Sequence, residues 1–456
     1  MSRPNLVLIH THDTGRHLGC YGADAATPNL NRLASQGVLF RRAFCASPSC
    51  SASRASLLTG LYPHNNGMIG LCHRGFRLND PRQHLSNLLR DAGYATQLIG
   101  VQHEVMPADL GGLGYDNVIE NSKLELHSAE RGKLAANWLR SVPKRPFFLN
   151  VGFYETHRKF LPAESPDDPR FIAPLPWLPD DPKIRGDVAE LNTAVRHVDQ
   201  AVGSILHALD ETKLAGNTLV IFTTDHGIPF PRAKGTLYDA GIGVSLILRG
   251  LEVFSGGKTI DSQVSQVDVL PTILPMLDVS VPAHAQGTSF LPVVQGRASS
   301  TRDDLFAEMT FHAAYDPMRC IRTERYKYIR YFEERPRVVL PNIDDSPTKD
   351  RLVELGYCDG ESPKELLFDL VSDPQECANL TDKPSMAGVR DDLRQRLRRW
   401  MESTNDPLLK GRVPLPPGGV LTPITARSPT DRRQSMATFK GRAVSGKPSE
   451  SCRQRS

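Results

Sequence analysis

A cysteine and an arginine stand four residues apart in the stretch Cys50-Ser51-Ala52-Ser53-Arg54-Ala55-Ser56-Leu57-Leu58-Thr59-Gly60. Ser53 is a good helix N-cap and Gly60 a good C-terminal stop, so we expect a short helix with Cys50 just ahead of its first turn. Free N–H groups and the helix dipole attract an anion to that end, and Arg54 adds a fixed positive charge. The spacing alone leaves open whether Cys50 is reactive or a buried structural thiol.

Carboxylate and imidazole groups follow two predicted strands. The apolar run 6–10 is followed by Thr-His-Asp-Thr-Gly, which places Asp13 there, and the run 219–223 is followed by Thr-Asp-His-Gly, which places Asp225 and His226. Ligands bind at the carboxyl ends of strands in α/β sheets, so two aspartates from two strands can coordinate one divalent cation. Carboxylates suit calcium, magnesium or manganese, and imidazole shifts the preference toward manganese or another transition ion. The alternative is that both aspartates only cap helices.

The elements that must position these groups alternate between strands and helices over roughly the first 300 residues. We expect strands at 6–10, 38–40, 96–100, 147–153, 219–223 and 244–248, and helices at 29–35, 84–92, 129–142, 189–209 and 268–277, the last interrupted by a proline. Alternation of this kind predicts an α/β sandwich with helices on both faces of the sheet.

The pattern changes after residue 300. Three consecutive strands are expected at 305–307, 318–322 and 326–332, which suits a small antiparallel sheet, and a charged helix at 389–401 can cover one face of it. From residue 405 the chain is rich in proline, arginine and serine, so it is expected to wrap the surface and then become disordered. We therefore predict a main domain over 1–300, a smaller α+β subdomain over 301–404 and a tail over 405–456.

Composition excludes several classes of protein. The 456 residues carry a net charge of +4, with 39% hydrophobic and 23% charged residues, which implies neither nucleic acid nor an anionic membrane as partner. No apolar run reaches the length of a membrane span, and the first apolar stretch is too short for an export signal. The eight cysteines form no CxxC pair or zinc-like spacing, so we expect mostly reduced thiols and a cytoplasmic location.

The stretch from Cys50 to Gly60 resembles the activation signature of the type I sulfatases, Cys-x-Pro/Ala-x-Arg followed by x-x-x-x-Thr-Gly. This chain has the Ala form, with Ala52, Arg54 and Thr59 also in register. The continuation Leu-Tyr-Pro-His-Asn-Asn-Gly-Met at 61–68 is similar to the heparan N-sulfatase (sulfamidase) branch of the family.

Further segments extend the resemblance over most of the chain, at 222–238, 317–319, 365–370 and 373–374. The resemblance implies an alkaline-phosphatase-like α/β sandwich, with a large mixed sheet flanked by helices and a smaller C-terminal antiparallel sheet. It also implies a formylglycine-generating maturation enzyme as a partner.

The family resemblance assigns roles to the strand-end residues. In this family the cysteine, here Cys50, is oxidised to formylglycine, and the hydrated aldehyde is the nucleophile. The metal ligands implied are Asp13, Asp225, His226 and the modified Cys50. His12 stands where the family usually has an aspartate; it can ligate through a ring nitrogen, but it removes one negative charge. We expect one divalent metal, calcium first, with manganese or magnesium as the alternatives.

The resemblance also supplies a sulfate clamp. Lys234 lies in Lys-Gly-Thr-Leu-Tyr, similar to the family's Lys-Gly-Thr-x-Tyr, and His157 follows a strand at the family's Pro-His position. His103 lies in Gly-Val-Gln-His, where the family has Gly-Lys-x-His, so Val101 replaces an expected cation. With Cys50 and Arg54, these three residues complete the expected catalytic set. Taken singly, each has an ordinary explanation: a solvated lysine, a surface histidine and a capping histidine.

The function expected is hydrolysis of a sulfate ester or sulfamate, on a saccharide or another small molecule. A phosphodiesterase or phosphonate monoester hydrolase of the same superfamily is the first alternative. The second is a catalytically silent binding protein, against which the intact cysteine signature argues, because a binder has no use for a convertible cysteine.

Overall fold

The computed structural model describes residues 3–119, 127–141, 145–431 and 434–435. Its largest sheet has eight strands in the order β10-β2-β9-β7-β1-β6-β4-β5. β1 lies between β6 and β7 and is parallel to both, whereas β9 is antiparallel to β7 and to β2, so the sheet is mixed, as predicted. The strands are β1 (Asn5–Thr11), β2 (Val38–Phe40), β4 (Ala95–Gly100), β5 (Asn117–Ile119), β6 (Phe147–Phe153), β7 (Thr218–Thr224), β9 (Leu246–Arg249) and β10 (Lys258–Ile260).

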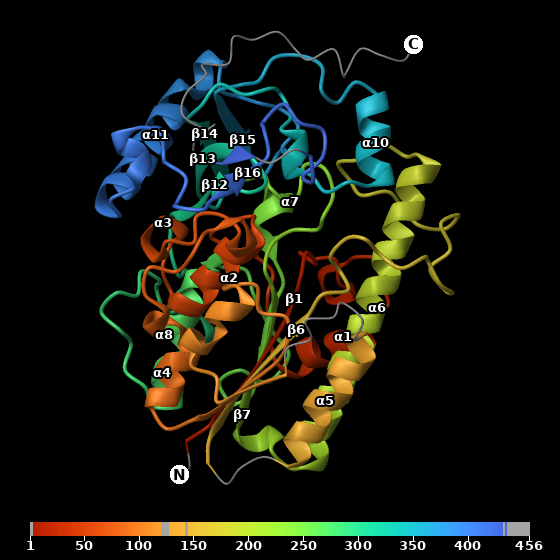
Figure 1. The fold of residues 1–456 in the computed structure, drawn as a ribbon, viewed down its shortest axis with the longest axis vertical. Coiled ribbons are helices and arrows are strands. Elements are labelled where there is room, and N and C mark those ends of the chain that lie inside the picture. The colour runs from red at the N-terminus through yellow and green to blue at the C-terminus, as the bar shows by residue number, and fades with distance from the viewer. Residues whose placement is uncertain (1–2, 120–126, 142–144, 432–433, 436–456) are drawn as a thin grey trace.

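Helices cover both faces of this sheet (Figure 1). Successive side chains of β1 point to opposite faces, so Val7 and Ile9 enter one core while Leu6 and Leu8 enter the other. The first core is closed by α1 (Pro28–Gln36), α5 (Ser128–Arg140) and α6 (Pro182–Glu211), and the second by α2 (Cys50–Thr59), α4 (Leu85–Asp91) and α8 (Val269–Ile273). The predicted sandwich is confirmed.

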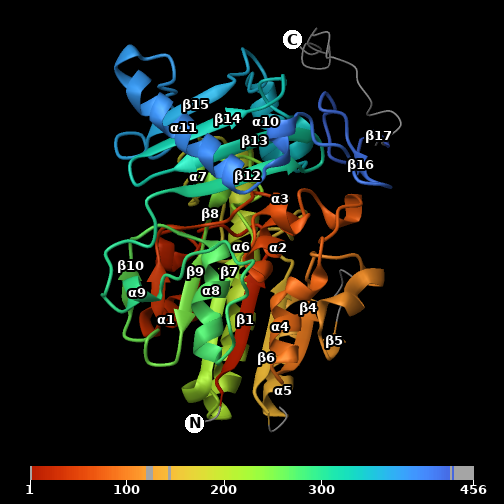
Figure 2. The same cartoon turned by 90° about the vertical axis from the view of Figure 1, so that its left-hand side faces the viewer.

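A four-stranded antiparallel sheet sits beyond one end of the large sheet (Figure 2). Met318, Cys320 and Ile329 join the second core, while the alternate residues Ile321 and Tyr328 pack with the buried side of α11. The elements are β12 (Leu305–Phe311), β13 (Tyr315–Arg322), β14 (Tyr326–Tyr331), β15 (Glu365–Asp369) and α11 (Ala387–Ser403). The predicted second sheet and its covering helix are therefore confirmed.

The limits of the domains stay a prediction. Part of the predicted tail, 436–456, lies outside the described residues. Before it, the chain adds the short strands β16 (Val420–Leu421) and β17 (Gln434–Ser435), and Val413 and Leu415 are buried against the second sheet. No helix in the described ranges is long and apolar enough to cross a membrane.

One predicted strand is in fact two. The run 244–248 divides into β8 (Gly243–Val244), which pairs with β3 (Ala43–Phe44), and β9 of the large sheet. The change of sheet falls at Ser245, whose N–H donates to the carbonyl of Gly15 at 2.9 Å. This hydrogen bond ties the chain after β1 to the neighbouring sheet, a long-range contact that the local apolar run does not reveal.

Candidate active site

The carboxyl ends of β1 and β7 bring the two predicted aspartates together. The strands pair in register to Thr11 and Thr224, and the N–H of Asp13 donates to Asp225 Oδ1 at 2.8 Å. Asp13 has a φ of +46°, a left-handed conformation that is uncommon for a residue other than glycine. Gly227 is required next to the site, because a Cβ there would lie 1.9 Å from the carbonyl oxygen of Ala240. The carboxylates are therefore fixed by the backbone.

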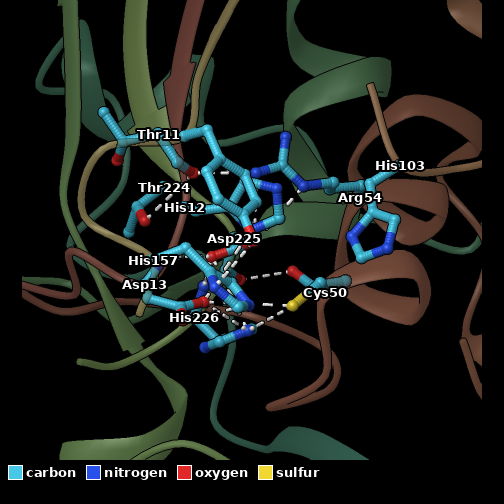
Figure 3. A network of polar contacts seen from close by, with 12 residues as sticks. Thr11, His12, Asp13, Cys50, Arg54, His103, His157, Thr224, Asp225 and His226 are labelled. Carbon is cyan, nitrogen blue, oxygen red and sulfur yellow. Dashed lines mark hydrogen bonds and ion pairs between the residues drawn. The ribbon is translucent and has the colours of Figure 1, made fainter. Parts of the chain in front are cut away.

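The helix that carries the cysteine starts earlier than predicted. α2 begins at Cys50 itself, with Ser49 as its extended N-cap residue, so the expectation that Ser53 is the N-cap was wrong. The Ser53 hydroxyl is used elsewhere: it lies within hydrogen-bond distance of two acceptors, the carbonyl of Asp225 and Gln266 Oε1, the latter at 2.8 Å. Cys50 Sγ points into the cluster, 3.2 Å from His226 Nε2 and 3.9 Å from Asp13 Oδ1 (Figure 3).

Arg54 is buried one turn further along α2, and its guanidinium points toward Asp225 and the end of β1. Its Nε and Nη2 donate to Asp225 Oδ2 at 3.2 and 3.0 Å, and Nη2 also donates to the carbonyl of Thr11 at 3.0 Å. Its Nη1 contacts His10 Nδ1. Burial alone would raise the pKa of Asp225, but the charges of His226 and Arg54 outweigh it and hold that pKa well below its usual value. Asp225 therefore stays a carboxylate.

Lys234 joins two carboxylates on the other side of the site. Its Nζ donates to Asp13 Oδ2 at 2.7 Å and to Asp344 Oδ2 at 2.9 Å, and lies 3.3 Å from His157 Nε2. Burial lowers the pKa of Lys234, but the two carboxylates outweigh it and raise that pKa well above its usual value. Burial likewise opposes ionisation of Asp344, yet the Lys234 charge holds its pKa at about 2.

His12 provides the test of whether a metal fits here. Its ring is fully buried; Nδ1 lies 3.1 Å from Asp225 Oδ2, whereas Nε2 makes no hydrogen bond to any described residue. Ligand atoms of His12, Asp13, Cys50 and Asp225 all lie within 4.8 Å of one another. Buried polar atoms without partners are costly, and two carboxylates with an imidazole form a donor set suited to a divalent cation. The residues present therefore fit the expected metal.

Two further predicted histidines lie toward the outside of the cluster. His157 stacks on Tyr154, whose hydroxyl lies 3.0 Å from His157 Nδ1, and burial lowers the pKa of His157 to about 4. His103 packs against His12 with ring centroids 5.4 Å apart, and burial lowers its pKa well below the usual value. On its other side, His103 Nε2 lies 3.2 Å from Nδ1 of the exposed His73. All the predicted residues thus meet in one place.

The sequence did not indicate three residues that contribute to this region. Asp344 reaches Lys234 from the segment before α10 (Pro347–Glu354), His73 stacks on His103, and His312 Nδ1 lies 3.0 Å from the hydroxyl of Ser49. Asp344 lies in the connection between β14 and β15, and His312 in the turn between β12 and β13, so connections of the second sheet complete the site. The repeated Asp-Asp at 344–345 was a weak signal at best, because loop aspartates are common.

Electrostatically, the site is a buried set of alternating charges. Three carboxylates, on Asp13, Asp225 and Asp344, meet two cations, on Arg54 and Lys234. A divalent cation beside the aspartates would make the set net positive. Such a site can bind a tetrahedral oxyanion next to Cys50 and stabilise charge as it develops there.

Comparison with known proteins gives two family matches. The model described as sulfatase matches residues 4–279, and the model described as N-sulphoglucosamine sulphohydrolase, C-terminal, matches residues 232–354. The human protein named N-sulphoglucosamine sulphohydrolase is 32% identical, over 89% of this chain and 91% of its own length. An ulvan-active sulfatase from Formosa agariphila is 28% identical, over 92% of this chain and 84% of its own.

Solved structures show the same fold. One from the metabolism of multiple glycosaminoglycans by Bacteroides thetaiotaomicron superposes with a TM-score of 0.73. It is 20% identical and covers 91% of this chain and 100% of its own.

Proposed function

The chain belongs to the sulfatase family, and from this premise we propose that it hydrolyses a sulfate ester or sulfamate on a sugar. The observation that carries the proposal is the place of Cys50. The cysteine of the sulfatase signature points into a buried cluster of carboxylates and cations, at the first turn of a helix. The names of the human and Formosa relatives, which act on N-sulphoglucosamine and ulvan, support a saccharide substrate.

We propose that Cys50 acts after oxidation to formylglycine, whose hydrate offers an oxygen nucleophile. A divalent metal held by Asp13, Asp225, His12, His226 and this residue would supply a concentrated positive charge next to the sulfate oxygens. Calcium is our first candidate, because oxygen ligands dominate the set, and manganese and magnesium are the alternatives since His12 replaces a carboxylate.

The chain's own residues then have distinct tasks. Arg54 keeps Asp225 ionised and fixed, and Lys234 can donate to an equatorial sulfate oxygen from its position beside Asp13. His157 and His103 lie on the outer side and can give a proton to the leaving oxygen or nitrogen. Both are neutral in this structure because burial lowers their pKa values, and a bound sulfate anion would oppose that effect.

Two measurements on the same protein preparation, mass spectrometry and an activity assay, test the proposal. Protein made in a host with the maturation enzyme should show aldehyde in place of thiol in the peptide that contains Cys50, by mass spectrometry. The same protein should then hydrolyse an aryl sulfate or a sugar sulfamate faster than a phosphodiester or a phosphonate. Activity in fully thiol protein would reject the formylglycine, preference for phosphorus substrates would favour the alternative hydrolases, and no turnover with aldehyde present would favour a binding protein.

We also propose the cytoplasm as the place of action. Its support is that the seven described cysteines are all free thiols. A maturation enzyme in the same compartment is then required, and coexpression with and without one should decide whether Cys50 is converted.

A further inference from the structure

The exposed fractions of the side chains show which side of the site a substrate must enter. The side chains of Asp13 and Asp225 are 0% exposed, and that of Lys234 is 3% exposed. By contrast, the side chain of His157 is 20% exposed and that of Asp344 is 17% exposed. Lys234 Nζ lies between them, so these two residues stand on the solvent side of the buried cluster. A substrate bound at Cys50 can therefore extend past them.

Asp344 has one occupied oxygen and one that is open. Oδ2 accepts from Lys234 Nζ at 2.9 Å, whereas no described residue donates a hydrogen bond to Oδ1. The neighbouring Asp345 is different: its side chain is 52% exposed, and it binds Lys349 Nζ at 2.8 Å and the hydroxyl of Ser428, away from the cluster. Of this acidic pair, only Asp344 faces the site.

The direction of in-line displacement at sulfur decides which side chains lie near the leaving group. When a nucleophile at the buried Cys50 attacks sulfur in line, the leaving atom lies on the side of sulfur away from Cys50, and the leaving group must extend toward solvent, where His157 and Asp344 are partly exposed. A carboxylate there can accept hydrogen bonds from hydroxyl or ammonium groups, and it repels a carboxylate or a second sulfate.

We propose that Asp344 is a specificity-determining residue that contacts the leaving group. It favours a leaving group that offers O–H or N–H donors, such as an amino sugar, over one that is anionic near the scissile bond. This inference rests on the proposed sulfatase function. Asp344 comes from the connection between β14 and β15 of the second sheet, so that connection sets which sugar is accepted.

The competing explanation is that Asp344 only balances the charge of Lys234. In that case its removal would affect every substrate alike, because Lys234 faces the sulfate and not the leaving group. The two explanations are separated by comparing a leaving group that has hydrogen-bond donors with one that lacks them.

The experiment uses full-length Asp344→Asn protein, with Asp345→Asn as the matched control. With N-sulfoglucosamine, kcat/KM should fall about 10- to 100-fold in Asp344→Asn, the range for a hydrogen bond to a charged group. With 4-nitrophenyl sulfate, whose leaving group has no donor, the loss in the same variant should be at least about tenfold smaller than with the sugar, because only the sugar loses a hydrogen bond to the leaving group, and Asp345→Asn should leave both substrates within about twofold. Equal losses on both substrates, or no loss on the sugar, would overturn the proposal.

A binding measurement separates this proposal from the proposed function. Glucosamine, which has no sulfate, is titrated into Cys50→Ala protein and into the Cys50→Ala/Asp344→Asn double variant by calorimetry, with thermal unfolding to check that both are folded. The double variant should bind glucosamine at least about tenfold more weakly, and glucuronic acid no more weakly. Equal affinities for glucosamine would overturn the role of Asp344, whereas failure of the wild-type protein to release sulfate would overturn only the proposed function.

Discussion

Replacing Lys234 with methionine should destabilise the protein in a way that a bound divalent metal partly reverses. The ammonium is 3% exposed and is shared by Asp13 at 2.7 Å and Asp344 at 2.9 Å. Removing one partner of a buried ion pair costs about 3–5 kcal/mol. Proton uptake limits the penalty, since protonating an aspartate at pH 7 costs about 4 kcal/mol when its unfolded pKa is about 3.9. We therefore expect a loss of about 3–4 kcal/mol in the metal-free protein.

A metal at Asp13 changes this result. Calcium at about 100 times its dissociation constant stabilises a folded protein by about 2.7 kcal/mol. Without the ammonium of Lys234, repulsion of the metal is smaller, so binding should be at least about tenfold tighter in the variant, which adds about 1.4 kcal/mol. The stability deficit of the variant should therefore shrink from about 3–4 to about 2 kcal/mol once both proteins are saturated with calcium.

Urea denaturation at pH 7, in EDTA and in excess calcium chloride, measures the two deficits. Lys349→Met is the matched control, because Lys349 is also buried and binds a carboxylate, Asp345 at 2.8 Å, but outside the cluster. Its deficit should be the same with and without calcium. A Lys234→Met deficit that calcium leaves unchanged would refute the reasoning, since the metal would then not be bound beside Asp13.

Three other perturbations test separate parts of the argument. Cys50→Ser supplies one hydroxyl in place of the two of the formylglycine hydrate, so it should turn over at most once, accumulate a sulfated serine and lose at least about a thousandfold in rate. Cys50→Ala should form no adduct. Intact-mass measurement after incubation with substrate decides this, and sustained turnover by the serine variant would contradict it. His12→Asp should shift metal preference toward calcium over manganese, and unchanged affinities for both in calorimetry would remove His12 from the ligand set. Burial lowers the pKa of His84 to about 3 in the folded protein. As the pH falls below 6.5, this histidine is therefore protonated in the unfolded chain but not in the folded one, and the free energy of unfolding decreases until the pH reaches about 3. Between pH 7 and 5 the free energy of unfolding of the wild-type protein should therefore fall by about 2 kcal/mol more than that of His84→Asn. Urea denaturation of both proteins at both pH values measures this, and an equal decrease in the two proteins would reject it.

The parts of the fold that local pattern determines could be predicted from the sequence. β6 coincides with the predicted strand at 147–153, because an apolar run that is buried on both faces has clear limits. α6 was predicted only from residue 189 but begins at Pro182, where the side chain of Asp181 caps it. Its first turns are more polar than the rest, so periodicity detected only the buried part.

The residues of the site divide in the same way, into those that the local sequence indicated and those that depend on long-range contacts. Asp13, Asp225 and Cys50 could be predicted because strand-end positions and a specific motif indicated them. Asp344 could not, because its contact with Lys234 spans 110 residues and depends on how the second sheet sits against the first. The N-cap of α2 was missed for a similar reason, since the Ser53 hydroxyl bonds Gln266, 213 residues away.

The order in which the site is synthesised sets a period during which Cys50 is accessible. The imidazole that contacts Cys50, on His226, is 176 residues later in the chain. At about 5–20 residues per second, a ribosome needs roughly 9–35 s to cover that distance. Until then β7 cannot pair with β1, and the pocket that buries Cys50 to 2% exposure is incomplete. The proposed maturation enzyme would therefore have roughly 9–35 s to oxidise this thiol on the growing chain, before folding covers it.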